Sequence, residues 1–197
     1  MWRKISLAII IAFLFFTLVG VIISLSGGLS RYNVNVGYVD IVGVITSSRR
    51  YVSFINELEK DPRIKAVILR IDSPGGGVAA SQEIYDAIKR LRERGKPVVA
   101  SMGAVAASGG YYIACAANKI VAEPGSVTGS IGVIIEMAGV EELLNKIGIR
   151  VEVIKSGKHK DIGSPFRPMT DEERKLLKGV VMDIYDQFVE AVSESRH

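Results

Sequence analysis

The sequence predicts an α/β domain with a largely parallel sheet, preceded by one apolar N-terminal helix. Two observations lead to this fold class. Short β-branched apolar runs alternate with helical patterns along most of the chain, as they do where helices join parallel strands. The start of the chain also contains a long stretch without a charged residue, which is typical of a membrane-spanning helix. With 197 residues and 48% apolar content, the chain can form one such domain and a short appendage.

The N-terminal stretch reads ISLAIIIAFLFFTLVGVIISL and has about the ~20 residues that a bilayer-spanning helix needs. Its apolar core is longer than that of a cleavable signal peptide, and no clear cleavage site follows it. Arg3 and Lys4 precede it, so the positive-inside rule places the N-terminus in the cytoplasm. We therefore expect a cytoplasmic segment at 1–4, a transmembrane anchor at 5–26, a tether at 27–34 and an extracytoplasmic domain at 35–197 in the cell membrane.

Composition excludes several classes of protein. The net charge of +4 is spread along the chain without a block of like charges, so nucleic acid is not an expected partner. The single cysteine, Cys115, excludes an intrachain disulfide and is expected to be a small buried residue. No Cys/His cluster has metal-ligand spacing, and no P-loop is present. We expect no metal, no cofactor and no nucleotide.

The elements are expected in a fixed order along the domain. Strands are predicted at 36–45, 64–72, 97–102, 119–123, 130–135 and 150–155. Helices are predicted at 51–59, 78–94, from 108, at 138–147 and from 170. The run 64–72 is apolar throughout, which is typical of a strand buried on both faces. In the last helix Thr170 and Glu173 fit a capping box, and an apolar stripe follows at helical spacing: Leu177, Val181, Ile184, Phe188 and Val192.

The segment DSPGGG, residues 72–77, follows a predicted strand at the edge where α/β proteins place ligands. Proline and glycine are ordinary turn residues, so a simple turn is one interpretation. Three consecutive glycines exceed what a turn requires, however. Their exposed N–H groups could receive a developing negative charge.

The segment GAVAASGGYYIACAA, residues 103–117, surrounds one hydroxyl with small residues. We expect Ser108 at the start of a helix, where unpaired N–H groups gather and where Gly109 could donate to an oxyanion. Serine is also a common N-cap, and small residues also allow close packing, so a structural role is the alternative. If Ser108 is a nucleophile, its pocket is expected to be lined from 104–107 and 78–80.

A nucleophilic serine needs a base, and the candidates lie in KSGKHKDIGSP, residues 155–165. A Ser-His-Asp triad would use His159 with Asp72 or Asp161. A Ser-Lys dyad would use a lysine that desolvation keeps neutral. Spacing alone does not choose among His159, Lys158 and Lys160.

Three segments together resemble the signal peptide peptidase A (SppA) family of membrane-anchored Ser-Lys peptidases. They are RIDSPGGG, SMGAVAASGGYYIACAANKIVAEPGSVTGSIGV and VIKSGKHKDIGSPFRPMTDEER. The resemblance implies that Ser108 is the nucleophile and Lys160 the general base. It further implies that Gly75 and Gly109 form the oxyanion hole and that Ser130 orients the lysine.

The resemblance also implies the fold and the biology. It predicts a Clp protease/crotonase-like fold of repeated β-β-α units, and a homo-oligomeric ring or dome. The expected substrates are cleaved signal peptides and other unfolded apolar peptides. A catalytically inactive scaffold and a crotonase-like acyl-CoA enzyme are the alternatives on this fold. Family members usually continue past the long helix, so the sequence is expected to be part of a longer protein.

Overall fold

The computed structural model describes residues 14–19, 21 and 35–196. Two compact units, Met1–Val34 and Asn35–His197, are considered separately. In the first unit the described residues 14–19 and 21 are helical, and most of the predicted anchor 5–26 falls outside them. Within the described residues, no helix combines the length and the hydropathy that crossing a bilayer requires.

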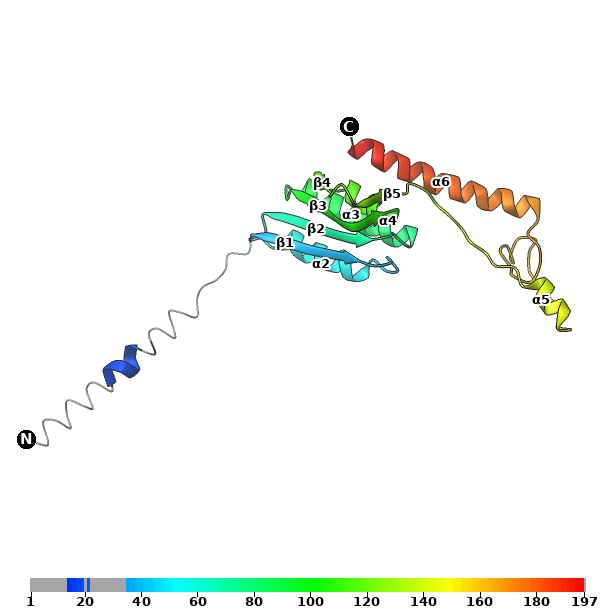
Figure 1. Cartoon of the computed structure of the whole chain (residues 1–197), viewed down its shortest axis with the longest axis horizontal. Helices are drawn as coiled ribbons and strands as arrows, with labels where there is room; N and C mark the ends of the chain where they lie inside the picture. Colours follow the sequence, from blue (N-terminus) through cyan, green and yellow to red (C-terminus); the bar gives the residue numbers. More distant parts are fainter. Residues whose placement is uncertain (1–13, 20, 22–34, 197) are drawn as a thin grey trace, which may run out of the picture. The chain divides into compact units, whose positions relative to one another are not determined.

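The second unit is built on a parallel sheet with the strand order β1-β2-β3-β4 (Figure 1). Strand β5 pairs with the far end of β3, also in parallel. The bounds are β1 Val36–Val42, β2 Ala66–Ser73, β3 Val98–Ala107, β4 Lys119–Val121 and β5 Val127–Gly129. The α/β class with a parallel sheet is therefore confirmed. Up to α4 a single strand precedes each helix, so the expected repeat of two strands and a helix is not the pattern of this sheet.

Three helices follow the first three strands and supply the core. They are α2 Arg49–Lys60, α3 Val78–Glu93 and α4 Gly109–Cys115. Alternate residues of β1 and β2 are buried in one cluster with side chains of these helices, and the central members are Val39, Ile41, Leu69, Ile71, Ile84, Ile88 and Ile113. Burial of this apolar surface is the main stabilising contribution to the domain.

The prediction that β2 is buried on both faces is wrong for the described chain. Ile68 is 37% exposed, and Arg70 and Asp72 on the same face are half-buried. Buried and exposed residues alternate along β1 as well. The period of two places one set of side chains against the helices and leaves the other set without a covering layer.

The last helix, α6 Asp171–Ser195, begins with the predicted capping box. Glu173 N–H donates to Thr170 Oγ1 over 3.2 Å, and Thr170 N–H donates to Glu173 Oε2 over 3.0 Å. The C-terminal half of α6 packs on α4, where Phe188 meets Tyr112 edge-on with ring centroids 5.1 Å apart. Arg196 then donates to the carbonyl oxygen of Ala117 over 2.8 Å. These contacts fix the C-terminal half of α6 against α4 and the residues that follow it.

Two predicted strands, 130–135 and 150–155, are not strands in this structure. Within them Ile134 is 79% exposed and Ile154 is 96% exposed. A strand needs a partner that accepts its backbone hydrogen bonds, and neither segment pairs with another described segment. The helix between them, α5 Glu141–Lys146, is shorter than predicted and buries no residue. Residues 130–170 thus form an arm with little packing of its own.

Candidate active site

Ser108 lies at the junction of β3 and α4 with an unusual backbone conformation. Its φ is +50°, in the region that side-chain-bearing residues rarely adopt, and such strain costs on the order of 1–3 kcal/mol. Its carbonyl oxygen accepts from Tyr112 N–H in the first turn of α4. Its side chain makes no capping hydrogen bond. Capping therefore does not explain this serine, and the strained turn presents its hydroxyl.

The glycines beside Ser108 are required because two turns approach each other at backbone distance. Gly75 has a φ of +99°, and a Cβ there would lie 2.7 Å from Gly109 N and 2.8 Å from Ser108 Cβ. A Cβ on Gly109 would collide with Ser81 Oγ of α3. The SPGGG turn and the ASGG turn are thus packed against each other, which explains the loss of bulk on both sides of the serine.

The backbone N–H groups near Ser108 differ in how they are used. Gly109 is the first residue of α4, so its N–H has no partner within the helix. Gly75 N–H, by contrast, donates to the buried Ser73 Oγ over 3.1 Å. Ser73 Oγ in turn donates to Gly43 O over 2.6 Å. The neighbouring Gly76 N–H has no hydrogen-bond partner among the described residues.

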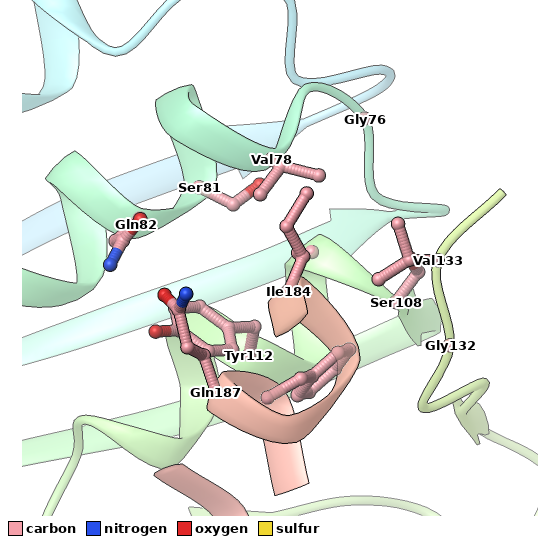
Figure 2. Close-up of a pocket in the computed structure, with 12 residues that line it drawn as sticks. Gly76, Val78, Ser81, Gln82, Ser108, Tyr112, Gly132, Val133, Ile184 and Gln187 are labelled. Atoms are coloured by element: carbon pink, nitrogen blue, oxygen red, sulfur yellow. The ribbon is translucent and has the colours of Figure 1, made fainter. Parts of the chain in front are cut away.

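A pocket opens beside Ser108. In Figure 2 the side chain of Ile184 points from α6 towards Val78, and the amide groups of Gln82 and Gln187 lie on the side away from Ser108. Burial raises the pKa of Tyr112 to about 12, so its phenol stays protonated at neutral pH. The lining comes from four parts of the chain: Gly76, Val78, Ser81, Gln82, Ser108, Gly109, Tyr112, Gly132, Val133, Ile184, Gln187 and Phe188.

The predicted lining was right only at Val78. Residues 79–80 and 104–107 do not line the pocket, and of these Ala106 is fully buried in the core at the end of β3. The contribution of α6 was missed. The stripe that includes Ile184 and Phe188 was visible in the sequence, but a stripe does not say which surface it meets.

The basic segment lies elsewhere and is bound to the start of α6. Lys155 Nζ donates to Asp161 Oδ1 over 2.6 Å. Lys158 pairs with Glu172, and His159 Nε2 lies 3.2 Å from the same carboxylate. Within the described part of the chain, Lys160 is the one cation of 155–160 that forms no ion pair, and its side chain is exposed.

The chain does not bring Lys160 to its own Ser108. Asp161, next to Lys160, is joined through Arg167 to Glu173 in the first turn of α6. The pocket meets α6 at Ile184, eleven residues further on. At a rise of 1.5 Å per residue, about 16 Å of helix separates these two points. Lys160 does not line the pocket.

The other predicted residues have clear positions. Ser130 follows Gly129, whose carbonyl oxygen accepts from Ser108 N–H over 2.8 Å, so Ser130 lies in the segment bonded to Ser108. Its φ of +53° is also strained. Asp72 Oδ1 accepts from Val105 N–H over 3.1 Å and does not contact His159. Asp161 pairs with lysine and arginine, so the described contacts assemble no Ser-His-Asp triad.

Cys115 is fully buried in the core, as the sequence predicted. Burial raises the pKa of its thiol, which disfavours the reactive thiolate. Packing accounts for this residue.

Fold and site together define an α/β protein with a strained serine, flanked by glycines, between a parallel strand and a helix. Residues 90–197 match the sequence profile of Peptidase family S49, and residues 44–128 match that of Clp protease. The chain belongs to peptidase family S49. The resemblance to the SppA family is thereby confirmed.

Three curated relatives support this family assignment. "Putative protease MJ0651" of Methanocaldococcus jannaschii is 44% identical over 150 residues, which cover 76% of this chain and 48% of that protein. "Serine protease SPPA, chloroplastic" of Arabidopsis thaliana is 40% identical over 89% of this chain and 25% of its own length. "Protease 4" of Salmonella typhi is 39% identical over 73% of this chain and 23% of its own length. The chain spans half or less of these relatives.

Proposed function

We propose that the protein is a serine endopeptidase in which Ser108 is the nucleophile and Lys160 the general base. The observation that carries the proposal is the strained, uncapped Ser108 at the mouth of an apolar pocket. Serine at φ +50° is costly unless the conformation is used. Family membership supplies the reaction class, hydrolysis of a peptide bond.

In the proposed reaction, neutral Lys160 Nζ accepts the proton of Ser108 Oγ as that oxygen attacks the peptide carbonyl carbon. The oxyanion that forms receives a hydrogen bond from Gly109 N–H and a second from the glycine turn. We propose Gly75 as this second donor, once its N–H leaves Ser73 Oγ. The Lys160 ammonium then protonates the leaving amine. Water releases the acyl group with the lysine again as base.

The ion pairs of the basic segment favour Lys160 over its neighbours. A side chain that is held in an ion pair is not free to approach the serine hydroxyl. Lys155, Lys158 and His159 each contact a carboxylate, whereas Lys160 contacts none among the described residues. This distinction is what the sequence alone could not provide. Ser130 is the proposed partner that orients the lysine.

We propose that Lys160 reaches Ser108 of a second copy in a homo-oligomer. Its turn is bonded to α6 about 16 Å along the helix from the pocket of its own chain. The arm that carries it exposes apolar side chains that a partner would cover, and these include Ile134, Leu143, Ile147 and Ile154. Its two strand-like segments, 130–135 and 150–155, would find their missing hydrogen-bond partners there.

We further propose that residues 5–26 anchor the enzyme in the cell membrane with the catalytic domain on the extracytoplasmic face. The apolar walls of the pocket suit small or medium apolar side chains. Cleaved signal peptides and other unfolded apolar peptides are therefore the proposed substrates. An inactive scaffold is not favoured, since the proposed nucleophile and base are both present.

A fluorophosphonate probe tests the nucleophile and a mixing experiment tests the dyad. The probe is expected to label the wild type and not Ser108→Ala. Ser108→Ala and Lys160→Ala should each be inactive alone. After the two are unfolded and refolded together, activity should return, because some sites combine an intact serine with an intact lysine. Labelling of Ser108→Ala would refute the nucleophile, and inactive mixtures that still form oligomers would refute the shared site.

A further inference from the structure

The turn that carries Lys160 has no regular secondary structure to hold it. Between α5 and α6 the described chain contains neither a helix nor a strand. Three backbone hydrogen bonds close tight turns there, and one of them runs from Lys160 N–H to Gly157 O over 3.2 Å. These local bonds shape the turn without fixing its position relative to the domain. Side chains must do so.

Arg167 makes the most extensive of the side-chain contacts that fix this turn to α6. Its Nε donates to Asp161 Oδ2 over 2.8 Å and its Nη2 to Asp161 Oδ1 over 2.9 Å. Its Nη1 donates to Glu173 Oε2 over 2.8 Å and its Nη2 to Glu173 Oε1 over 2.5 Å. One planar guanidinium therefore binds two carboxylates, each through both oxygens. This is the geometry that arginine provides and lysine does not.

The two carboxylates belong to different parts of the site. Asp161 directly follows Lys160 in the sequence. Glu173 is 2% exposed and closes the capping box of α6 with Thr170, so it is fixed to the helix that lines the pocket. Arg167 also lowers the pKa of Asp161, and it lowers the pKa of Glu173 to about 2, so both stay ionised over the working range of a lysine base.

We propose that Arg167 is a positioning residue for catalysis, which fixes the Lys160 turn to α6 by bridging Asp161 and Glu173. This inference rests on the proposed role of Lys160 as the base. Other charged groups around the turn also form ion pairs. Lys155 pairs with Asp161, and Lys158 and His159 pair with Glu172. Each of these is a contact of one cation with one carboxylate. Among the described residues, Arg167 is the one side chain that joins Asp161 to the buried Glu173 of α6.

The test compares Arg167→Ala and Arg167→Lys with the wild type in peptide hydrolysis over a range of pH. We expect kcat to fall by about ten-fold or more in both, with little change in KM, because substrate binding at the pocket is intact. The pH dependence of the rate should also change, because a lysine that is no longer held in place meets a different set of neighbouring charges. Millimolar guanidinium should restore part of the activity of Arg167→Ala and none of that of Lys160→Ala.

Two controls separate positioning from folding. Arg174→Ala removes the same charge from the first turn of α6, next to Glu173, where the side chain is exposed, and should keep wild-type activity. Thr170→Ala weakens the helix cap but leaves the bridge, so it should lower thermal stability without moving the pH profile. If Arg167→Ala instead resembles Thr170→Ala, with an unchanged profile and no rescue, the positioning role is refuted.

The same experiments distinguish the two proposals. Activity in Lys160→Ala would refute the dyad itself. An inactive Lys160→Ala beside an Arg167→Ala of wild-type kcat and pH profile would refute only the role of Arg167. Asp161→Asn supplies a further check, since the double variant with Arg167→Ala should lose no more activity than the worse single variant.

Discussion

Ser108 donates its backbone N–H to the carbonyl oxygen of Gly129 over 2.8 Å, and this bond joins the Ser108 turn to the end of β5. Three residues at this contact, Ser108, Gly129 and Ser130, have positive φ values. Two strained segments therefore meet through one backbone hydrogen bond. The position of Ser130 relative to the nucleophile follows from backbone geometry and does not depend on a flexible side chain.

Ser108→Ala should abolish peptide hydrolysis and leave the domain folded. Loss of a nucleophile costs several orders of magnitude in rate. The Ser108 side chain makes no capping bond, and alanine meets the same backbone strain, so the melting temperature should change little. Activity and thermal unfolding measured on the same preparation check this. Retention of more than a few per cent of activity would exclude Ser108 as the nucleophile.

Lys160→Ala and Lys160→Arg should both be inactive, whereas Lys158→Ala and His159→Ala should keep most of their activity. Arginine cannot accept the serine proton because it does not lose its own. Lys158 and His159 both form an ion pair with Glu172, and this contact holds their side chains at the start of α6. Initial rates on one peptide decide the matter. An inactive His159→Ala beside an active Lys160→Ala would reverse the assignment.

The rate of hydrolysis should rise as the pH increases, because only a neutral amine accepts the serine proton. Ser130→Ala should lower kcat by about ten-fold without abolishing it, since the lysine loses an orienting partner and not its function. Ser193→Ala on the exposed side of α6 is a matched control. A profile that peaks in mild acid would contradict a lysine base.

The folding stability of the domain should decrease in acid, because the buried carboxylate of Glu173 in α6 becomes protonated. Hydrogen bonds from Arg167, and then from the Thr170 backbone, lower the pKa of Glu173 from 4.5 to about 2. Because the folded value is the lower one, this contribution is complete above pH 4.5 and is lost as the pH falls towards 2. Urea unfolding at pH 7 and pH 3 measures it. The Glu173→Gln variant should have a lower free energy of unfolding than the wild type at pH 7. Its free energy of unfolding should also fall less than that of the wild type between pH 7 and pH 3.

Gly109→Ala should destabilise the domain by about 1–3 kcal/mol and remove activity, because its Cβ has no space beside Ser81. The double variant Gly109→Ala/Ser81→Gly removes the colliding side chain and should recover part of the stability. Gly125→Ala is the control, since no atom lies within 4 Å of a Cβ there. Equal melting temperatures for Gly109→Ala and Gly125→Ala would show that the turns are not closely packed.

The sequence predicted what local patterns determine. The strands at the centre of the sheet, the helices that follow them and the Thr170 capping box were correct because each depends on nearby residues. The strands 130–135 and 150–155 were wrong because a strand exists only with a partner, and pairing is not a local property. The sequence also could not predict that Ile184 lines the pocket or that Arg167 bridges Asp161 and Glu173. Both depend on how α6 packs, which periodicity does not specify.

The 25-residue helix α6 affects the distance between active centres in the proposed oligomer. At 1.5 Å per residue the helix is about 37 Å long, and about 16 Å of it separates the first turn, to which the proposed base is bound, from the pocket wall at Ile184 near the middle of the helix. In the proposed assembly α6 therefore determines the distance between neighbouring active centres. One residue inserted after Val180 would rotate the first turn by about 100° relative to Ile184 and direct Lys160 away from its target. Seven inserted residues would nearly restore the direction but separate the centres by about 10 Å more. The length of helix between the first turn and Ile184 would thus set the repeat distance of the proposed assembly.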